Sequence, residues 1–459
     1  MTSVSNPPIP TSSTDLPPVE RRPAIPAGFL AGGLAAGIKP SGRPDLAIVL
    51  ATGGPAAAAA VFTPNAFAAA PVRLSQTHLA ATSGDPSGRF GWADAIVSTS
   101  GCANAATGAA GDTDQAIIAS HLAGAFNMAV TTGTLHLSTG LIGTRLPVEA
   151  IGIGIDQLVL RLAATDAALA AAAEALRTTD SKTKVATTVI ELPDADGRPV
   201  AVRVSGIAKG VGMIHPQMAT MLAILLTDAA VEPRVLSTLL RPAAARTWDQ
   251  LSIDGDTSTN DTVVVLASGA SGAAPVGAGS AAADALGGAI EAVARDLARQ
   301  QAADGEGATT LITAAVTGAR DDADARAVAR AVVSSSLVKA AVHGRDPNWG
   351  RIAGAAGNAR LAPAPVLEAA GLSAKAATAR AGTPAELEPA TLQITIAGRR
   401  VFDGTSGGPL DFDRAAVREG MNAPEVVLAL DLGLGTGRGE AFGCDLTEAY
   451  VIENSEYTT

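Results

Sequence analysis

Cysteine and aromatic residues are scarce in this chain of 459 residues. The only cysteines are Cys102 and Cys444, which are too few for a disulfide framework and lack the spacing of zinc ligands. We therefore expect two buried thiols, no bound metal and a reducing, cytoplasmic environment. Aromatic residues make up only 3% of the chain, so the core must be built from Ala, Val, Leu and Ile.

The chain also lacks an excess of positive charge and a long apolar run. Its formal net charge is -11, and an acidic surface repels phosphate backbones, so we expect no nucleic-acid partner. The apolar runs are all too short for a transmembrane helix, which predicts no membrane span. Residues 1–25 are rich in Pro, Ser and Thr and do not have the pattern of a signal peptide, so we expect a disordered N-terminal tail.

Several common catalytic motifs are missing. The segment 433–439 (GLGTGRG) fails the G-x-G-x-x-G pattern of dinucleotide sites, because Arg438 and Glu440 stand where glycine is needed. None of the five histidines forms an H-x-x-x-H pair, and no G-x-S-x-G elbow precedes a helix. These absences argue against a dinucleotide enzyme, a metalloenzyme and a Ser–His–Asp hydrolase.

Apolar periodicity predicts helices and strands that alternate without a strict repeat, as in a layered α/β or α+β fold. Two segments rich in Ala, Gly and Pro, 269–280 and 362–387, are predicted as loops or insertions. The predicted helices are 111–129, 156–177, 233–249, 279–303 and 321–341. The predicted strands are short ones within 46–72, then 94–98, 184–192, 199–207, 262–268, 308–317 and 425–432.

The segment 206–228 allows two interpretations. It has a lysine flanked by glycines, a proline, and then Ala219-Thr220 before an apolar run, which is typical of a loop entering a buried helix or strand. The chemical interpretation starts from the weakness of a threonine hydroxyl as a nucleophile. If the peptide bond before Thr220 is cut, the new α-amine, with a pKa of about 7.7–8.0, can serve that hydroxyl as its base.

The same segment resembles the ornithine acetyltransferase family, through the run K-G-x-G-M-I-x-P-x-M-A-T-M-L at residues 209–222. The resemblance covers about residues 26–459, and the motifs follow the family's order. The other matching motifs are GFLAGGLAAGIK (28–39), VFTPNAFAAAPV (61–72), SGCANAATG (100–108), STGLIG (138–143), TTD (178–180), DGDTSTND (254–261), DGEGAT (304–309), DPNWGRI (346–352) and GCDLTEAYVIENSEYTT (443–459).

The resemblance implies a chain that cuts itself between Ala219 and Thr220. The implied products are an α chain of residues 1–219, of which 26–219 belong to the catalytic unit, and a β chain of residues 220–459. They would fold together in the layered fold shared with a group of β-aminopeptidases. Two copies of each chain would form a heterotetramer.

The implied reaction moves acetyl from N2-acetylornithine to glutamate through an acetyl ester of Thr220. No cofactor is implied, although acetyl-CoA could be a second acetyl donor. Thr139 and Gly140 match the oxyanion hole. The matching substrate-binding positions are Thr178 (or its neighbour Thr179), Lys209, Thr220, Glu306, Asn454 and Thr459.

Three residues depart from the family's pattern: Gln217, Thr99 and Cys102 stand where asparagine is usual. They leave the acyl group and the accepting amine open, so a related acyltransferase of specialised metabolism is an alternative. An aminopeptidase of the same fold is a second alternative. A non-catalytic, uncleaved ligand-binding protein is a third.

Overall fold

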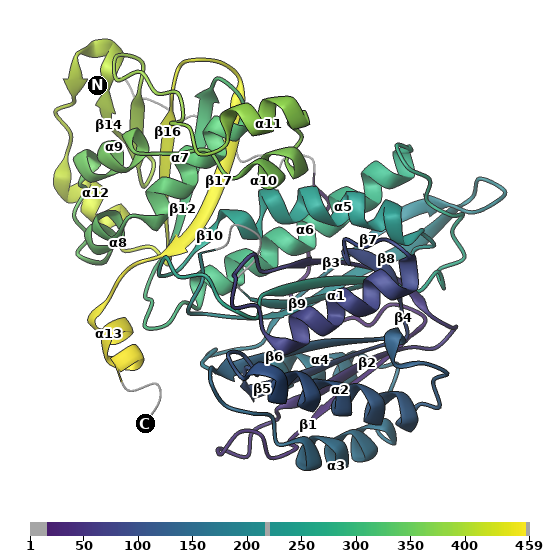
Figure 1. Ribbon diagram of the computed structural model, residues 1–459. Helices are drawn as coiled ribbons and strands as arrows, with labels where there is room; N and C mark the ends of the chain where they lie inside the picture. Colours follow the sequence, from purple (N-terminus) through teal and green to yellow (C-terminus); the bar gives the residue numbers. More distant parts are fainter. Residues whose placement is uncertain (1–15, 216–220, 456–459) are drawn as a thin grey trace.

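The computed structural model describes residues 16–215 and 221–455 and contains three β-sheets (Figure 1). The first sheet has the strand order β1-β2-β5-β6, with only β5 and β6 parallel. Helices α2 and α3 cover its outer face, and α1 and α4 lie between it and the second sheet. The elements of this layer are β1 (Phe29–Leu34), β2 (Leu46–Ala51), α1 (Ala70–Ser83), β5 (Ala95–Cys102), α2 (Gly108–Ala125), η1 (Thr131–Gly133), β6 (Thr134–Leu141), α3 (Val148–Val159) and α4 (Asp166–Leu176).

The second sheet has the order β4-β3-β11-β9-β8-β7, and α5 and α6 pack on its outer face. Its central strands β9 and β11 read LAILLT and TVVVLA and are buried throughout, as expected for strands with both faces covered. These two strands follow residue 220, yet they lie between β3 and β8, which precede residue 216. The elements are β3 (Ala56–Phe62), β4 (Phe90–Ala93), β7 (Lys184–Pro193), β8 (Pro199–Lys209), β9 (Leu222–Thr227), α5 (Pro233–Arg246), β11 (Thr262–Ala267) and α6 (Ala281–Ala303).

The third sheet has the order β10-β17-β12-β16-β13-β14-β15 and comes entirely from the second half of the chain. Helices α7, α8, α9 and α12 add side chains to its core, whereas α13 extends away from the sheet (Figure 1). The elements are η2 (Trp248–Gln250), β10 (Leu251–Ser252), β12 (Leu311–Ala319), α7 (Asp322–Ser334), α8 (Ser336–His343), α9 (Trp349–Gly357), α10 (Ala364–Ala369), α11 (Ala374–Arg380), β13 (Gln393–Ile396), β14 (Arg399–Asp403), η3 (Gly404–Ser406), β15 (Gly408–Pro409), α12 (Arg414–Gly420), β16 (Glu425–Asp431), β17 (Gly437–Cys444) and α13 (Glu448–Ser455).

The predicted layered α/β fold is confirmed, and both cysteines are free and buried as expected. The prediction of one helix over 156–177 is wrong, because the chain breaks between α3 and α4. Thr165 starts the second helix by accepting a hydrogen bond from the Ala168 amide at 3.2 Å. The predicted helix 321–341 is likewise two helices, α7 and α8, with Ser335 capping the second.

Two further expectations need correction. The segment 362–387, predicted as a loop or insertion, contains the helices α10 and α11. The helix α1 was not predicted: the segment 46–72 was predicted as strands only, and no element was predicted for residues 73–83.

The disordered tail was predicted to reach residue 25, but residues 16–25 pack along the second sheet. Glu20 and Thr187 exchange backbone hydrogen bonds of 2.8 and 2.9 Å. Ala24 and Ile25 are buried, and the Ala24 carbonyl accepts a hydrogen bond from Ser205. The physical reason is that β7 is an edge strand, and an unpaired edge is stabilised when another segment covers it. Residues 1–15 lie outside the described part of the chain.

No helix of the described residues is long and apolar enough to cross a membrane.

Candidate active site

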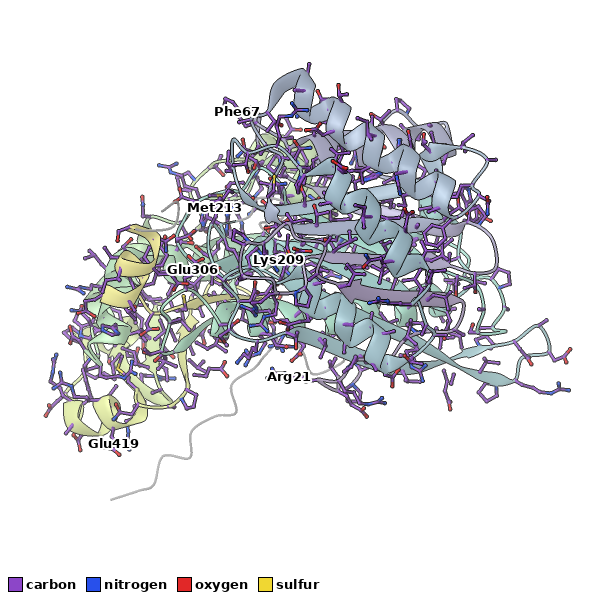
Figure 2. All side chains as sticks on the ribbon, turned by 90° about the horizontal axis from the view of Figure 1, so that it is seen from below. Arg21, Phe67, Lys209, Met213, Glu306 and Glu419 are labelled. Atoms are coloured by element: carbon purple, nitrogen blue, oxygen red, sulfur yellow. The ribbon has the colours of Figure 1, made fainter. Side chains whose placement is uncertain are left out.

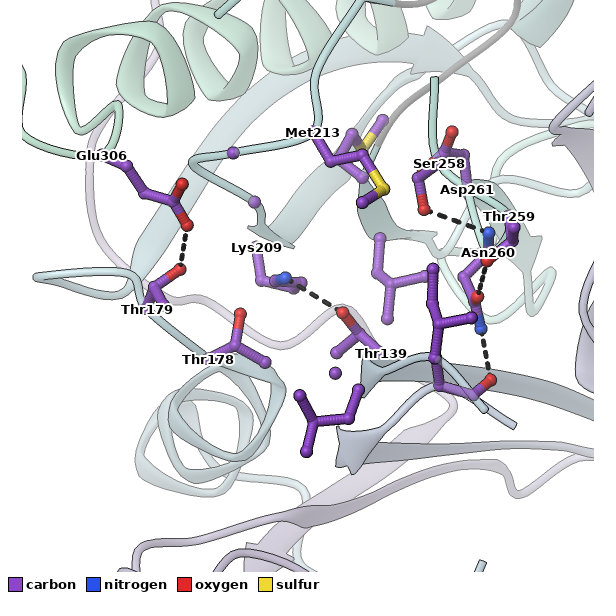
Figure 3. Close-up of a pocket in the computed structure, with 18 of the residues that line it drawn as sticks. Thr139, Thr178, Thr179, Lys209, Met213, Ser258, Thr259, Asn260, Asp261 and Glu306 are labelled. Atoms are coloured by element: carbon purple, nitrogen blue, oxygen red, sulfur yellow. Dashed lines mark hydrogen bonds between the residues drawn. The ribbon is translucent and has the colours of Figure 1, made fainter. Parts of the chain in front are cut away.

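A cavity of about 400 Å³ lies between the end of β6 in the first sheet and the ends of β8 and β9 in the second sheet, and the loop between α6 and β12 completes its wall (Figure 3). Lys209, Met213 and Glu306, which belong to its wall, lie near the middle of the molecule (Figure 2). Every described residue that the sequence predicted for the site lines it, namely Thr139, Gly140, Thr178, Thr179, Lys209, Glu306 and Asn454. The rest of the described lining is Ala103, Leu141, Ile142, Gly210, Gly212, Met213, Met221, Leu222, Ser258, Thr259, Asn260 and Asp261.

Thr139 and Gly140 lie near the end of β6, beside the parallel strand β5. Gly140 has a φ of 127°, and a Cβ placed on it would lie 2.3 Å from the carbonyl carbon of Gly101. Only glycine therefore lets the two strand ends approach each other and turn toward the cavity. This close approach positions a backbone turn of the kind that can donate hydrogen bonds to an oxyanion.

Lys209 is the last residue of β8, and its side chain is buried. Its Nζ donates a hydrogen bond of 3.1 Å to Thr139 Oγ1. Burial lowers the pKa of Lys209, and the carboxylates of Asp180 and Glu306 partly offset this effect. Because Thr139 Oγ1 accepts from the ammonium, its own hydrogen stays available for a second acceptor in the cavity.

Glu306 lies in the connection between α6 and β12, and its backbone amide donates to the Val211 carbonyl at 2.8 Å. Its side chain accepts hydrogen bonds from Thr179 Oγ1 at 2.8 Å and from Asn454 Nδ2 at 3.0 Å. A Cβ at Gly212 would lie 2.1 Å from Glu306 Oε2. The second glycine of the K-G-x-G run thus leaves room for this carboxylate, which the structure holds in one orientation.

A buried ion network supports this wall of the cavity, and the sequence did not predict it. Lys184 Nζ donates to Asp180 Oδ1 and to Asp304 Oδ2, both at 2.6 Å. Asp180 also accepts from the backbone amides of Thr178 at 3.1 Å and Gly210 at 2.9 Å. Asp180 therefore ties the loop that carries Thr178 to the end of the strand that carries Lys209.

The electrostatics of Asp180 show how strongly this network is coupled. Burial alone would raise the pKa of this carboxyl group, but the nearby charges of Lys209 and Lys184 and the hydrogen bonds lower it to about 2. The TTD motif contains Asp180, but only its threonines were predicted to belong to the site. An aspartate followed four residues later by a lysine normally reads as a solvated pair, so burial was needed to recognise it.

Asn260, in the motif DGDTSTND, is a second residue whose role the sequence did not predict. Its Nδ2 donates to the carbonyl oxygens of Ala103 at 2.6 Å and Ser138 at 2.9 Å. Ser138 directly precedes Thr139, so Asn260 fixes the end of β6 at the predicted oxyanion hole. A conspicuous polar run such as DGDTSTND could have suggested this role, because a buried amide needs partners.

The ArgJ family model matches residues 30–459. The chain belongs to the ArgJ family. The "Arginine biosynthesis bifunctional protein ArgJ" of a Synechococcus species is 42% identical over 443 residues, covering 95% of this chain and 96% of that protein. The protein of the same name from Thermus thermophilus is 41% identical over 435 residues, covering 95% of this chain and 99% of that protein. A crystal structure of ornithine acetyltransferase complexed with ornithine from Mycobacterium tuberculosis is 37% identical, covers 44% of this chain and 99% of that chain, and has a TM-score of 0.38.

Membership of the ArgJ family confirms the family that the motifs predicted, and with it the prediction that the chain is an acyltransferase enzyme. Four residues lie outside the described part of the chain: Ala219, Thr220 and Thr459, which were predicted for the site, and Gln217, which departs from the ArgJ pattern. Met221, the residue after Thr220, lines the cavity.

Two departures from the ArgJ pattern can be placed. Thr99 is buried in β5, opposite Leu46 of β2 and Ser138 of β6. Cys102 is buried at the end of the same strand, and its Sγ lies 3.2 Å from the Thr144 carbonyl oxygen. Neither is among the described residues that line the cavity, so both belong to the strand that supports the site.

The titratable groups do not suggest a metal centre. Among the described residues, no group of three His, Cys, Asp or Glu side chains is arranged to hold a metal ion. The polar side chains of the described lining are instead one ammonium, two carboxylates, the hydroxyls of threonines and a serine, and amides. This set can bind a zwitterionic substrate that also carries a second charge, because opposite charges stand at different points of the wall.

Proposed function

We propose that this protein transfers an acetyl group from N2-acetylornithine to glutamate, through an acetyl ester of Thr220. The observation that carries the proposal is the convergence of Thr139, Gly140, Lys209 and Glu306 on one cavity, whose wall also contains Met221. These residues come from two sheets and from the loop between α6 and β12, and they match the family's functional positions by sequence. Membership of the ArgJ family, whose relatives are named for arginine biosynthesis, supports the same reaction.

Activation begins with scission between Ala219 and Thr220. The Thr220 hydroxyl oxygen attacks the Ala219 carbonyl carbon, the C–N bond breaks, and the nitrogen takes the proton to become an α-amine. Water then hydrolyses the resulting ester, which leaves a carboxylate on Ala219 and a free Thr220 hydroxyl. The strand order supports a stable nicked product, because β9 and β11 would remain between β3 and β8 of the other fragment.

The first half-reaction uses the new α-amine as the base. It takes the hydroxyl proton as Thr220 Oγ attacks the acetyl carbonyl, and a tetrahedral oxyanion forms. Thr139 and Gly140 stabilise that oxyanion by hydrogen bonding, which is worth about 2.7–4 kcal/mol for each donor in comparable sites. The C–N bond then breaks, ornithine leaves with the proton, and acetyl-Thr220 remains.

The second half-reaction reverses these steps with glutamate. Its amine attacks the acetyl ester, the C–O bond breaks, and the proton returns to Thr220 Oγ. Lys209 pairs with the α-carboxylate of either substrate, and Glu306 pairs with the side-chain ammonium of ornithine. Thr178, Asn454 and Thr459 complete the substrate contacts. The two substrates use one site in turn, so the kinetics are ping-pong.

Two finer features are part of the proposal. Acetyl-CoA serves as an alternative acetyl donor to glutamate, without a resident cofactor. Two α chains and two β chains assemble into a heterotetramer.

Intact-mass measurement of the purified protein, with N-terminal sequencing of any fragment, tests the scission. We expect two fragments, the second beginning at Thr220, and a single chain for Thr220→Ala, which should also have no turnover. An uninterrupted wild-type chain that is fully active would contradict the proposal.

Product analysis with N2-acetylornithine and glutamate tests the reaction itself. We expect ornithine and N-acetylglutamate in equal amounts. Ornithine and acetate without N-acetylglutamate would indicate a hydrolase, such as an aminopeptidase of the same fold. Transfer of a different acyl group, or to a different amine, would indicate an acyltransferase of specialised metabolism.

A further inference from the structure

A second cavity, of about 810 Å³, lies among α7, α8 and α9 on the third-sheet side of the molecule. It is separate from the candidate active site, although the same short segment borders both: Met213 lines the first cavity and His215 lines the second. The described lining consists of His215, Ala327, Arg330, Ala331, Ser334, Ser335, Leu337, Asn348, Gly350, Arg351, Gly354, Ala355, Asn358 and Arg360.

The charges of this lining are all of one sign. Arg330, Arg351 and Arg360 are cations, and no Asp or Glu occurs among the described residues of the wall. Within the described chain, none of these three guanidinium groups forms an ion pair. Arg351 donates to the Leu337 carbonyl at 3.0 Å, and Arg360 donates to the Gly382 carbonyl at 3.3 Å. Three cations on one concave surface are unexpected in a chain whose net charge is -11.

Arg330 is the most deeply placed of the three. Its Nη2 makes a long hydrogen bond of 3.4 Å to the His215 carbonyl, and its buried Nε has no hydrogen-bond partner in the described structure. Burial lowers the pKa of Arg330 to about 10, with partial compensation from Asp249. Arg330 therefore places a positive charge at the inner side of the cavity wall.

Two helix N-termini add to the positive potential. Ser335 and Asn348 cap α8 and α9, and both caps line the cavity together with residues of the first helical turns. The backbone amides and the helix dipole favour an anion at such positions. Asp346, an acidic group on this loop, accepts a hydrogen bond from Asn348 Nδ2 at 2.9 Å and lies 3.7 Å from Arg414, and it is not among the described residues that line the cavity.

We propose that this cavity is a binding site for a small molecule that carries phosphate groups. Guanidinium groups bind phosphate oxygens through paired hydrogen bonds, and the two helix N-termini supply further donors to the same anion. The proposal concerns a site outside the candidate active site and does not depend on the acetyl-transfer reaction.

Calorimetric titration of the full-length protein with inorganic pyrophosphate tests the proposal, with inorganic phosphate and citrate as separate arms. We expect pyrophosphate to bind more tightly than either, with an affinity that falls as the salt concentration rises. Arg351→Ala and Arg360→Ala should each weaken binding by at least about tenfold, because each removes charge-assisted donors. Arg399→Ala, at an exposed position of strand β14, is the control and should bind like the wild type.

Gly354 offers a matched pair of variants. A Cβ on this glycine meets no atom within 4 Å, so Gly354→Ala should fold and bind normally. Gly354→Glu adds a carboxylate to the wall and should abolish pyrophosphate binding while leaving the unfolding temperature close to that of Gly354→Ala. The absence of pyrophosphate binding at millimolar concentration would overturn the proposal. Binding that Arg351→Ala, Arg360→Ala and Gly354→Glu all leave unchanged would also overturn it, since the ligand would then occupy another surface. Tighter binding of citrate than of pyrophosphate would overturn the assignment to phosphate.

Discussion

Replacing Lys184 by methionine removes the buried ammonium that joins Asp180 to Asp304. Each of the two carboxylates lies 2.6 Å from Lys184 Nζ, and the lysine side chain is fully buried. Removing one partner of a buried ion pair costs about 3–5 kcal/mol, because an uncompensated charge remains. The ammonium of Lys209 still acts on Asp180, so we expect a loss of unfolding free energy near the lower limit, about 3 kcal/mol.

The pKa of Asp180 determines how the stability difference between the wild type and Lys184→Met changes with pH. In the wild type the pKa of Asp180 is about 2, below its ordinary value of 3.8. The resulting stability is present above about pH 4 and is lost as the pH falls toward 2. In Lys184→Met this pKa rises, so the carboxyl group takes up its proton at a higher pH. The difference between the two proteins should therefore be largest at neutral pH and shrink as the pH falls through the raised pKa of the variant toward about 2.

Urea unfolding followed by circular dichroism measures this difference. A Thr220→Ala background keeps both proteins as one chain if scission occurs. Lys182→Met is the matched control, because that neighbouring lysine is exposed and should cost little. If Lys184→Met is as stable as Lys182→Met, or if its deficit is the same at about pH 7 and at about pH 2.5, the reasoning about the buried network is wrong.

Three further predictions concern the candidate site and the association of the two fragments. Glu306→Gln should lower kcat/KM for acetylornithine by about 10- to 100-fold, through loss of the charge that faces the ammonium; a substrate without that ammonium should be affected much less. Gly140→Ala should lower kcat by at least about 100-fold, because its Cβ would lie 2.3 Å from Gly101 and displace the turn; an unchanged kcat would refute the oxyanion assignment. The two fragments of the cut protein should co-elute on gel filtration and separate only in denaturant, because β9 and β11 lie between β3 and β8; separation without denaturant would contradict this.

The sequence indicated the residues of the site because they occur in short motifs, and these motifs resemble those of a known family. The resemblance to the ornithine acetyltransferase family implied five of these residues, and all of them line one cavity: Thr139, Gly140, Lys209, Glu306 and Asn454. The buried strands β9 and β11 were partly predictable from their continuous apolar runs, and the long helix α6 from its periodicity. The break between α3 and α4 was missed, because a capping threonine inside an Ala-rich stretch is a weak signal.

Only the tertiary structure decided how these residues meet. Lys209 and Thr139 are 70 positions apart, and Glu306 and Thr179 are 127 apart, so no local pattern could show that they are hydrogen-bonded. The roles of Asp180 and Lys184 depend on burial, which changes a pair of charges from solvated to strongly coupled. The arginine-lined cavity has the same origin, since helix packing brings Arg330, Arg351 and Arg360 to one surface. Roles that depend on residue identity could thus be predicted from the sequence. Roles that depend on the distance between charges and on their burial could be recognised only in the folded structure, because both set the strength of the interaction.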